Sequence, residues 1–314
     1  MQLRALVTLF AFFVVVARDD AASLSKRVSD PFIPDEYFEV QLESAAHRAA
    51  IVSQWDIPVG ARVLEIGCGQ GDTTAVLAEL VGENGHVTGV DPASLDYGLP
   101  LTLSEAQARL SAGRLGSRIT WVHADPLAFL SGASTLKPTS EPYDVVVFSL
   151  SIWYFSSPSV FSAVLAALAP HAKRLCIAEW SLIASDPEAH GHVLASLAQA
   201  ALEYHNPGAT LNVRTIFPPA TIVRAAESPK GGGWKLVKES RFKPAARTPD
   251  GQWEVEAVLD PAFEKEMDEF VKDEQERAVV IAMRDAVRAA VDMVGGPKKV
   301  EPMDVWSGQF MRAQ

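Results

Sequence analysis

The chain has 314 residues, of which 48% are hydrophobic and 21% charged, so it is long enough to bury one large core with additions. Its formal net charge of -11 disfavours nucleic acid as a partner, because binding to phosphates requires a basic surface. The only two cysteines, Cys68 and Cys176, fall in predicted core segments and have no metal-ligand spacing, so neither a disulfide framework nor a metal site is predicted.

The N-terminus carries a signal-like segment. Residues 5–17 form a predominantly apolar run after Arg4. This run is short for a membrane span and has the length of a signal-peptide core. A cleaved signal, a short anchor, a buried segment and a misplaced start codon all fit the pattern. Localisation therefore stays open, although the remaining chain looks cytoplasmic, and membrane contact is expected only through this segment.

A predicted helix over residues 35–55 precedes the most informative stretch, Arg62–Asp91. That stretch reads as a strand containing Glu65, a glycine turn, a helix over 73–81 and a second strand that ends in an acid. Glycines let the backbone approach a ligand closely, and the start of the helix offers unpaired N–H groups. Asp91, about twenty residues after the glycines, is placed to accept hydrogen bonds from ribose hydroxyls.

The glycine spacing distinguishes between nucleotide ligands. The dinucleotide fingerprint is G-x-G-x-x-G, whereas this chain has Gly67, Gly69 and Gly71 at alternate positions. Glu65 and Asp72 flank the turn, which is unfavourable for a pyrophosphate but suits a ligand that carries an ammonium and a sulfonium. A dinucleotide oxidoreductase is therefore disfavoured, and an NAD(H) titration would test that reading.

From Glu65 to Gly71 the chain resembles the first motif, E/D-x-G-x-G-x-G, of the class I S-adenosylmethionine (SAM)-dependent methyltransferases. The resemblance covers about residues 45–259. It implies an α/β fold with a Rossmann-like seven-stranded sheet, mostly parallel with the last strand antiparallel, flanked by helices. It also implies SAM as the cofactor. The expected organisation is a leader and linker over 1–30, a methyltransferase domain over 31–260 and a helical extension over 261–314.

The next elements follow Asp91 in regular order. Ser104 is a plausible N-cap for a helix over 104–115, and a strand over 119–123 leads to Asp125. Asp125 is expected to cap a helix over 126–130, and the resemblance also places it at the adenine; both roles are compatible. The strand over 143–150 is predominantly apolar, as in the centre of a parallel sheet.

Three aromatic residues, Trp153, Tyr154 and Phe155, follow that strand. They either surround the sulfonium through cation–π attraction or form core for the helix over 159–168. Further on, a strand is predicted over 172–180, together with the following segments: helices over 186–203 and 218–227, strands over 234–242 and 253–259 as a closing hairpin, and one long helix over 263–293 as an outer brace or oligomer contact.

The resemblance implies that SAM is bound by the following residues: Glu65, Gly67, Cys68, Gly69, Gly71, Asp91, Pro92, Ala124, Asp125 and Ser149. Asp91 is expected at the ribose, Ala124 and Asp125 at the adenine, and Ser149 beside the reacting sulfur. No acceptor follows from the resemblance.

The predicted activity is methyl transfer to a small-molecule acceptor, for which a general base is needed only if the acceptor carries a proton to be removed. Weak candidates for that base are His190, His192, His205, Tyr154 and Glu179. Two alternatives stay open: a protein methyltransferase, and a SAM-binding protein without transferase activity. A homo-oligomer is compatible with the sequence.

Overall fold

The computed structural model describes residues 24, 25, 28, 38–99, 101–138, 141–206, 213–244 and 248–312. The predicted leader at residues 1–17 lies outside them. Among the described residues, no helix has both the length and the apolar character that a membrane crossing requires. The chain divides into two compact units, Met1–His123 and Ala124–Gln314.

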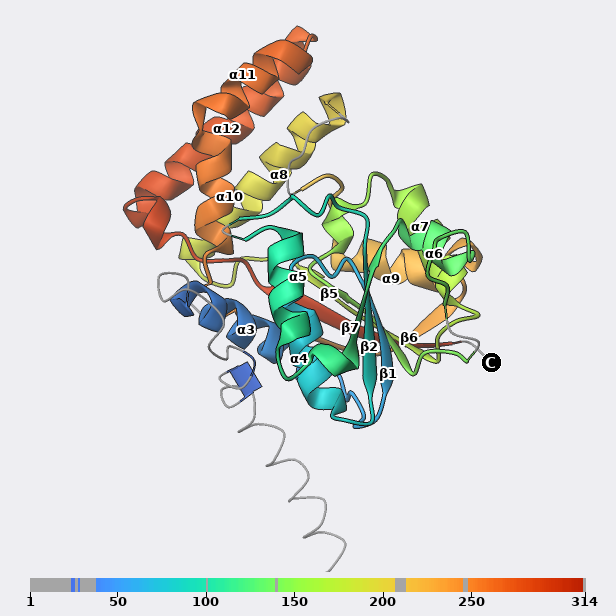
Figure 1. The fold of residues 1–314 in the computed structure, drawn as a ribbon. Coiled ribbons are helices and arrows are strands. Elements are labelled where there is room, and N and C mark those ends of the chain that lie inside the picture. The colour runs from blue at the N-terminus through green and yellow to red at the C-terminus, as the bar shows by residue number, and fades with distance from the viewer. Residues whose placement is uncertain are drawn as a thin grey trace, which may run out of the picture. The chain divides into compact units, whose positions relative to one another are not determined.

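The first unit alternates strands and helices (Figure 1). Its main elements are α3 (Phe38–Val52), β1 (Arg62–Ile66), α4 (Asp72–Val81), β2 (His86–Asp91), α5 (Leu103–Ala112) and β3 (Ile119–His123). β2 pairs in parallel with both β1 and β3, with Leu64 opposite Thr88 and Gly89 opposite Trp121. β1 and β2 are largely buried along their length, which is typical of central strands of a parallel sheet with helices on its faces.

The second unit contains the remaining strands and most of the helices. Its elements are α6 (Pro126–Leu130), β4 (Val145–Ser149), η3 (Ile152–Tyr154), α7 (Pro158–Leu168), β5 (Arg174–Trp180), α8 (His190–His205), α9 (Pro219–Glu227), β6 (Trp234–Phe242), α10 (Asp250–Leu259), α11 (Pro261–Phe270), α12 (Glu274–Val294) and β7 (Val305–Arg312). β4 and β5 are parallel, whereas β7 is antiparallel to both β5 and β6.

The strand order of the seven-stranded sheet is β3-β2-β1-β4-β5-β7-β6. The predicted fold class is therefore confirmed, including the antiparallel last strand of the chain. β7 lies between β5 and β6, with Trp180 opposite Val305 and Phe242 opposite the same residue from the other side. β7, which joins β6 to the rest of the sheet, is thus formed by the last described residues of the chain. These residues lie within the predicted helical extension.

The predicted strand over 253–259 is wrong, because these residues belong to helix α10. Val255 and Val258 are fully buried three residues apart, while Trp253 is 50% exposed. Apolar residues at 253, 255, 257 and 259 alternate, whereas those at 255, 258 and 259 follow a helical spacing, so the short pattern alone did not separate a strand from a helix. Contact with α8 decides it, because both valines belong to the core that α10 shares with α8.

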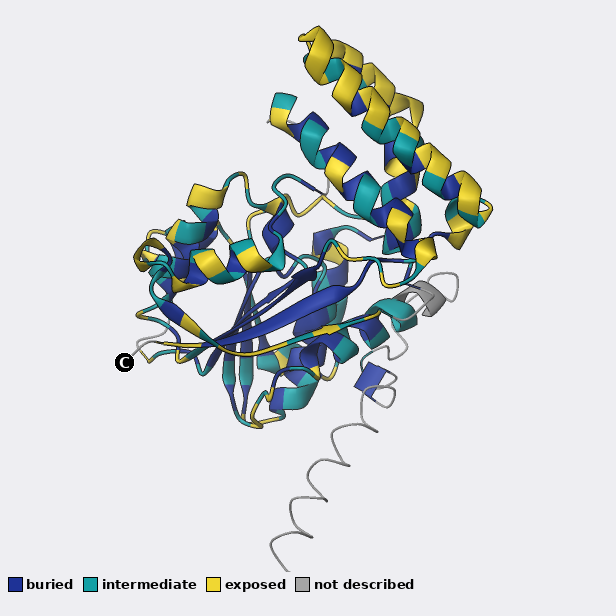
Figure 2. Cartoon of the chain, turned by 180° about the vertical axis from the view of Figure 1, so that it is seen from behind, coloured by how far each residue is buried: buried dark blue, intermediate teal, exposed yellow. Residues whose placement is uncertain are grey.

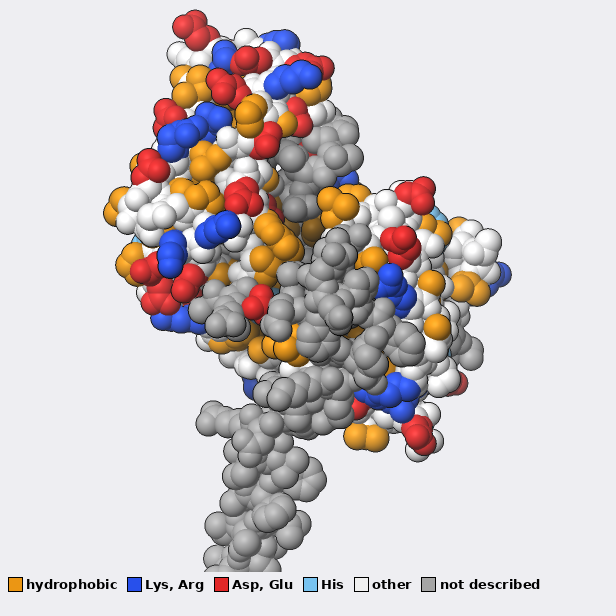
Figure 3. Space-filling view, turned by 60° about the vertical axis from the view of Figure 1, so that its left-hand side comes forward, with side chains coloured by type: hydrophobic (Ala, Val, Ile, Leu, Met, Phe, Trp, Pro, Cys, Tyr) orange, Lys and Arg blue, Asp and Glu red, His pale blue; other side chains and the backbone are white. Residues whose placement is uncertain are grey.

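The single long helix predicted over 263–293 is also wrong, because α11 and α12 are separate helices. Asp273 lies at the end of the short segment between α11 and α12. Its carboxylate accepts hydrogen bonds from the backbone N–H groups of Gln275 and Glu276, so it is the N-cap of α12. The helices bury one face in a core that includes Met267, Val280 and Val287 (Figure 2). Their outer faces carry side chains of both charges, as in a solvated helix (Figure 3).

The N-cap of α5 is Thr102 and not Ser104 as predicted. The Thr102 hydroxyl accepts a hydrogen bond from the Glu105 N–H, and the Glu105 carboxylate accepts one from the Thr102 N–H. This reciprocal capping box satisfies two N–H groups at once. Thr102 therefore starts the helix two residues earlier than the predicted cap.

Candidate functional site

The conformation of the turn between β1 and α4 depends on its glycines. Gly67, Gly69 and Gly71 have φ angles of 79°, 50° and 99°, in the region that side chains with a Cβ rarely adopt. The turn is fastened to the end of β2, because the N–H groups of Gly67 and Cys68 donate to the Val90 carbonyl at 2.8 and 3.3 Å. The loop therefore has one defined shape that only glycines adopt without strain.

The glycines at 69 and 71 have different surroundings. A Cβ at Gly71 would lie 2.6 Å from the Trp121 ring and 2.7 Å from the Leu110 side chain, so this glycine allows close packing. A Cβ at Gly69 would meet nothing within 4 Å. Gly69 is consequently the point of the turn at which another molecule can approach the backbone.

Asp91 is positioned by the turn at the end of β2. Its carboxylate accepts hydrogen bonds from the Gly69 N–H and the Ala93 N–H, both at 2.8 Å. One bond reaches each oxygen, and a carboxylate has about four acceptor positions, so each oxygen retains one for a ligand hydroxyl. Asp91 thus lies beside the glycine turn, and its role toward a ribose stays a prediction.

Two further acids border the turn. Glu65 is 2% exposed and accepts a hydrogen bond from the Thr74 hydroxyl at 2.5 Å. Burial raises the pKa of Glu65 to about 8 against the opposing effects of Thr74 and the Arg48 charge. Burial also raises the pKa of Asp72, and Arg48 again opposes the rise. Both carboxyls therefore gain from a positive charge nearby, because it stabilises their ionised forms.

Two glutamine side chains, one inside the motif and one in α5, support the turn, and the sequence analysis did not predict them. Gln107 of α5 donates to the Gly69 carbonyl at 2.8 Å, and the Gln70 side chain donates to the Leu101 carbonyl. Gly98 makes room for Gln70, because a Cβ there would lie 2.7 Å from the Gln70 amide nitrogen. The segment after β2 is thereby fixed against the glycine turn.

Cys68 and Pro92 contribute backbone and packing rather than reactive groups. Cys68 is buried, and burial raises the pKa of its thiol well above the ordinary value, so it stays protonated near neutral pH. Its side chain packs 3.0 Å from the position of a Cβ on Gly89. Pro92 follows Asp91 directly and is exposed.

In the second unit, Asp125 caps α6 as predicted. One carboxylate oxygen accepts hydrogen bonds from the Leu127 N–H at 2.9 Å and the Ala128 N–H at 3.0 Å. Ala124 precedes it and is half-buried, and Ser149 is buried at the end of β4. The cap occupies one oxygen, so the other is available to a ligand, and contacts of these three residues with an adenosyl group stay predictions.

The ends of β4 and β5 are strained and linked to each other. Leu150 and Leu182 have φ angles of 52° and 58°, which side chains with a Cβ rarely adopt. Such strain is typical of functional sites. The Leu150 N–H donates to the Ala178 carbonyl at 2.9 Å, and the buried Glu179 carboxylate accepts from the Ile152 N–H at 3.1 Å. Glu179 therefore fixes the start of η3 after β4.

The three aromatic residues in and directly after η3 have two kinds of environment. Trp153 is buried and its ring N–H donates to the Phe217 carbonyl at 3.4 Å. Phe155 packs against Phe148 and Phe161, with ring centroids 6.2 and 5.6 Å away. These contacts favour the core interpretation for both residues. Tyr154 is 47% exposed, so its ring is accessible to a ligand.

The candidate bases have different environments. His192 is buried, its Nδ1 accepts a hydrogen bond from the Met303 N–H at 3.1 Å, and burial lowers its pKa to about 3. It is therefore a neutral, weakly basic side chain that connects α8 to the segment before β7. His190 is exposed, and His205 lies 3.8 Å from the Glu276 carboxylate. A base role for any of the candidates stays a prediction.

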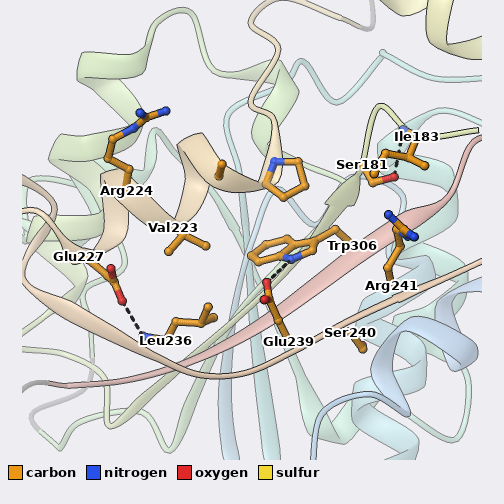
Figure 4. A pocket seen from close by; sticks show the side chains of 12 residues that line it. Ser181, Ile183, Val223, Arg224, Glu227, Leu236, Glu239, Ser240, Arg241 and Trp306 are labelled. Atoms are coloured by element: carbon orange, nitrogen blue, oxygen red, sulfur yellow. Dashed lines mark hydrogen bonds between the residues drawn. The ribbon is translucent and has the colours of Figure 1, made fainter.

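A separate pocket of about 790 Å³ lies between α9 and strands β6 and β7 (Figure 4). Its lining includes Val223, Leu236 and Trp306. The charged groups around it are engaged by the protein: Glu239 accepts from the Trp306 ring N–H at 3.0 Å, and Arg241 lies 3.3 Å from the buried Asp304 carboxylate. The pocket has the volume of a ligand site, but these charges already have partners.

Comparisons with known proteins agree with the geometry of the glycine turn. A family model described as a methyltransferase domain matches residues 63–173. Two methyltransferases of Diaporthe leptostromiformis, phomM' and phomM, are 32% and 31% identical over 290 residues, covering 81% of this chain and 74% of each relative. A solved cyclopropane-fatty-acyl-phospholipid synthase-like protein from Lactobacillus casei is 29% identical with a TM-score of 0.78, covering 91% of this chain and 98% of that protein.

Proposed function

The chain belongs to the class I SAM-dependent methyltransferases, and on this premise we propose that it transfers the methyl group of SAM to a small-molecule acceptor. When bound, SAM supplies a methyl group made electrophilic by the adjacent sulfonium. The chain has to hold the adenosyl end, accommodate the positive charge and align an acceptor with the methyl carbon. Most of the rate acceleration in such a displacement comes from positioning and electrostatics.

The observation that carries the proposal is the pairing of Asp91 with the open backbone at Gly69. The Gly69 N–H holds one Asp91 oxygen at 2.8 Å, and the space beside Gly69 is free of protein atoms within 4 Å of a Cβ position. A ribose there would present its two hydroxyls to a fixed carboxylate. The residues present therefore fit the adenosyl group that the family implies.

The charges around the turn support a cationic ligand over a pyrophosphate. Glu65 and Asp72 both border the turn, and burial favours their neutral forms. A ligand with a positive charge would favour the ionised forms, whereas a pyrophosphate would be repelled by them. An ammonium and a sulfonium match this environment, and both are present in SAM.

Replacement of Asp91 tests the proposal directly. We expect Asp91→Ala to weaken binding of SAM by about 1.5–3 kcal/mol, the usual cost of losing hydrogen bonds to a charged group. Isothermal titration calorimetry measures the change, and Asp96→Ala, an exposed acid in the loop after β2, is the matched control. An unchanged affinity for Asp91→Ala would remove this residue from the ribose site.

Turnover separates a transferase from a protein that only binds SAM. Incubation of the purified chain with SAM and a panel of small-molecule acceptors should produce S-adenosylhomocysteine (SAH), detected by mass spectrometry. SAH formation with protein acceptors alone would instead support a protein methyltransferase. Tight SAM binding without SAH formation on any acceptor would contradict the proposed activity.

A further inference from the structure

Arg48 of α3 carries an unpaired buried nitrogen. Its Nη1 atom is inaccessible to solvent and has no hydrogen-bond partner among the described residues. A guanidinium has five N–H donors, and leaving one buried without an acceptor costs free energy. An acceptor supplied by a bound molecule would remove that cost.

The Arg48 charge acts on the glycine turn without being neutralised by it. Arg48 interacts electrostatically with both Glu65 and Asp72, opposing the effect of burial on their pKa values. No ion pair within 4.0 Å joins Arg48 to either acid in the described part of the chain. Helix α3, which carries Arg48, packs against α4, whose first residue is Asp72 (Figure 1). The guanidinium therefore lies near the turn, and its Nη1 group has no hydrogen-bond partner among the described residues.

The chemistry of the proposed ligand requires a cation at this place. The methionine portion of SAM carries an α-ammonium and an α-carboxylate on the same carbon. Glu65 and Asp72 suit the ammonium but would repel the carboxylate. Arg48 is the cation that acts on both of these acids. A planar guanidinium also matches the two oxygens of a carboxylate.

We infer that Arg48 binds the α-carboxylate of the methionine portion, and that it makes the site select ligands that retain this carboxylate. The inference rests on the proposed function and assigns a specificity-determining residue within it. A purely structural Arg48, which only neutralises Glu65 and Asp72, would affect all adenosyl ligands equally. The two roles therefore differ in their dependence on the ligand.

The test pairs variants of the full chain with two ligands. SAH carries the complete amino-acid end, whereas decarboxylated SAH, 5′-(3-aminopropylthio)adenosine, keeps the ammonium and lacks the carboxylate. Isothermal titration calorimetry is run on the wild type, Arg48→Gln, Arg48→Lys and Arg114→Gln. Arg114 is the matched control, because it is a partly exposed cation of the same unit paired with Glu79.

We expect Arg48→Gln to weaken SAH binding about 10- to 150-fold while changing the affinity for decarboxylated SAH less than about twofold. Arg48→Lys keeps the charge near Glu65 and Asp72 but loses the planar fork, so a smaller loss for SAH alone is expected. Arg114→Gln should change neither affinity.

Equal losses for both ligands in Arg48→Gln and Arg48→Lys would overturn the inference in favour of a structural role. Unchanged SAH binding in both variants would also overturn it. Neither result would affect the proposed function, because wild-type binding and turnover would remain. A wild type that binds neither ligand would overturn the inference and the proposed function together.

Discussion

The glycine turn at residues 67–71 adopts its conformation through local constraints, whereas residues 250–312 depend on contacts with distant segments. Three glycines with positive φ shape the turn, and its N–H groups bond to Val90 and Asp91 at the end of the next strand. In contrast, α10 and α12 bury their apolar faces against α8, and β7 completes the sheet beside β5. The turn therefore relies on its glycines and on bonds to the end of β2, whereas the C-terminal segment relies on packing against α8 and on pairing with β5.

The first prediction concerns the C-terminal core, where we expect the largest effect. Met267 is 2% exposed in the cluster formed by α8 and α10–α12, so Met267→Ala should lower the free energy of unfolding by about 2–5 kcal/mol. Met293 is 86% exposed, and Met293→Ala should change it by less than about 0.5 kcal/mol. Urea unfolding followed by circular dichroism measures both. If Met267→Ala lowered the free energy of unfolding as little as Met293→Ala does, this core would contribute little to stability.

The second prediction separates packing from ligand access within the turn. Gly71→Ala should destabilise the chain by about 2–4 kcal/mol, because the new Cβ would strike Trp121 and Leu110 at a positive φ. Gly69→Ala meets no protein atom, so it should cost only the backbone strain of about 1–2 kcal/mol. We expect Gly69→Ala to weaken SAH binding despite its smaller cost in stability. Urea unfolding and calorimetry are the measurements, and equal destabilisation would contradict the difference.

The third prediction uses one buried titratable group beside each region, Glu65 before the turn and His192 against the segment that leads to β7, and the expected change in the free energy of unfolding per pH unit is the smallest. The pKa of His192 falls from 6.5 to about 3 on folding, so the unfolded chain binds a proton that the folded chain does not. Stability should therefore fall as the pH decreases from about 6.5 toward 3. The pKa of Glu65 rises from 4.5 to about 8, so stability should fall as the pH increases through that range. Each slope reaches about 1.4 kcal/mol per pH unit at most.

Two variants separate these slopes. His192→Gln should remove the loss on the acid side, and Glu65→Gln should remove the loss on the alkaline side, as measured by urea unfolding between pH 4 and 8.5. An acid-side slope that persists in His192→Gln would assign it to other groups. An alkaline-side slope that persists in Glu65→Gln would likewise assign that slope to other groups.

The sequence by itself determined the fold class, the glycine turn between the first two strands and the cap at Asp125. These features follow from residues close along the chain or from a βαβ unit of about thirty residues, whose backbone requirements only certain residue types satisfy. The local sequence pattern therefore indicates these features.

Only the tertiary structure decided that residues 250–259 are helical, that β7 enters the sheet between β5 and β6, and that Arg48 lies near Glu65 and Asp72. The seven apolar and acidic residues from Trp253 to Leu259 fit either a helix or a strand, and burial against α8 selects the helix. Likewise, the distance in sequence between Arg48 and Asp72 hides their proximity. Contacts between distant segments depend on packing, which no local pattern specifies.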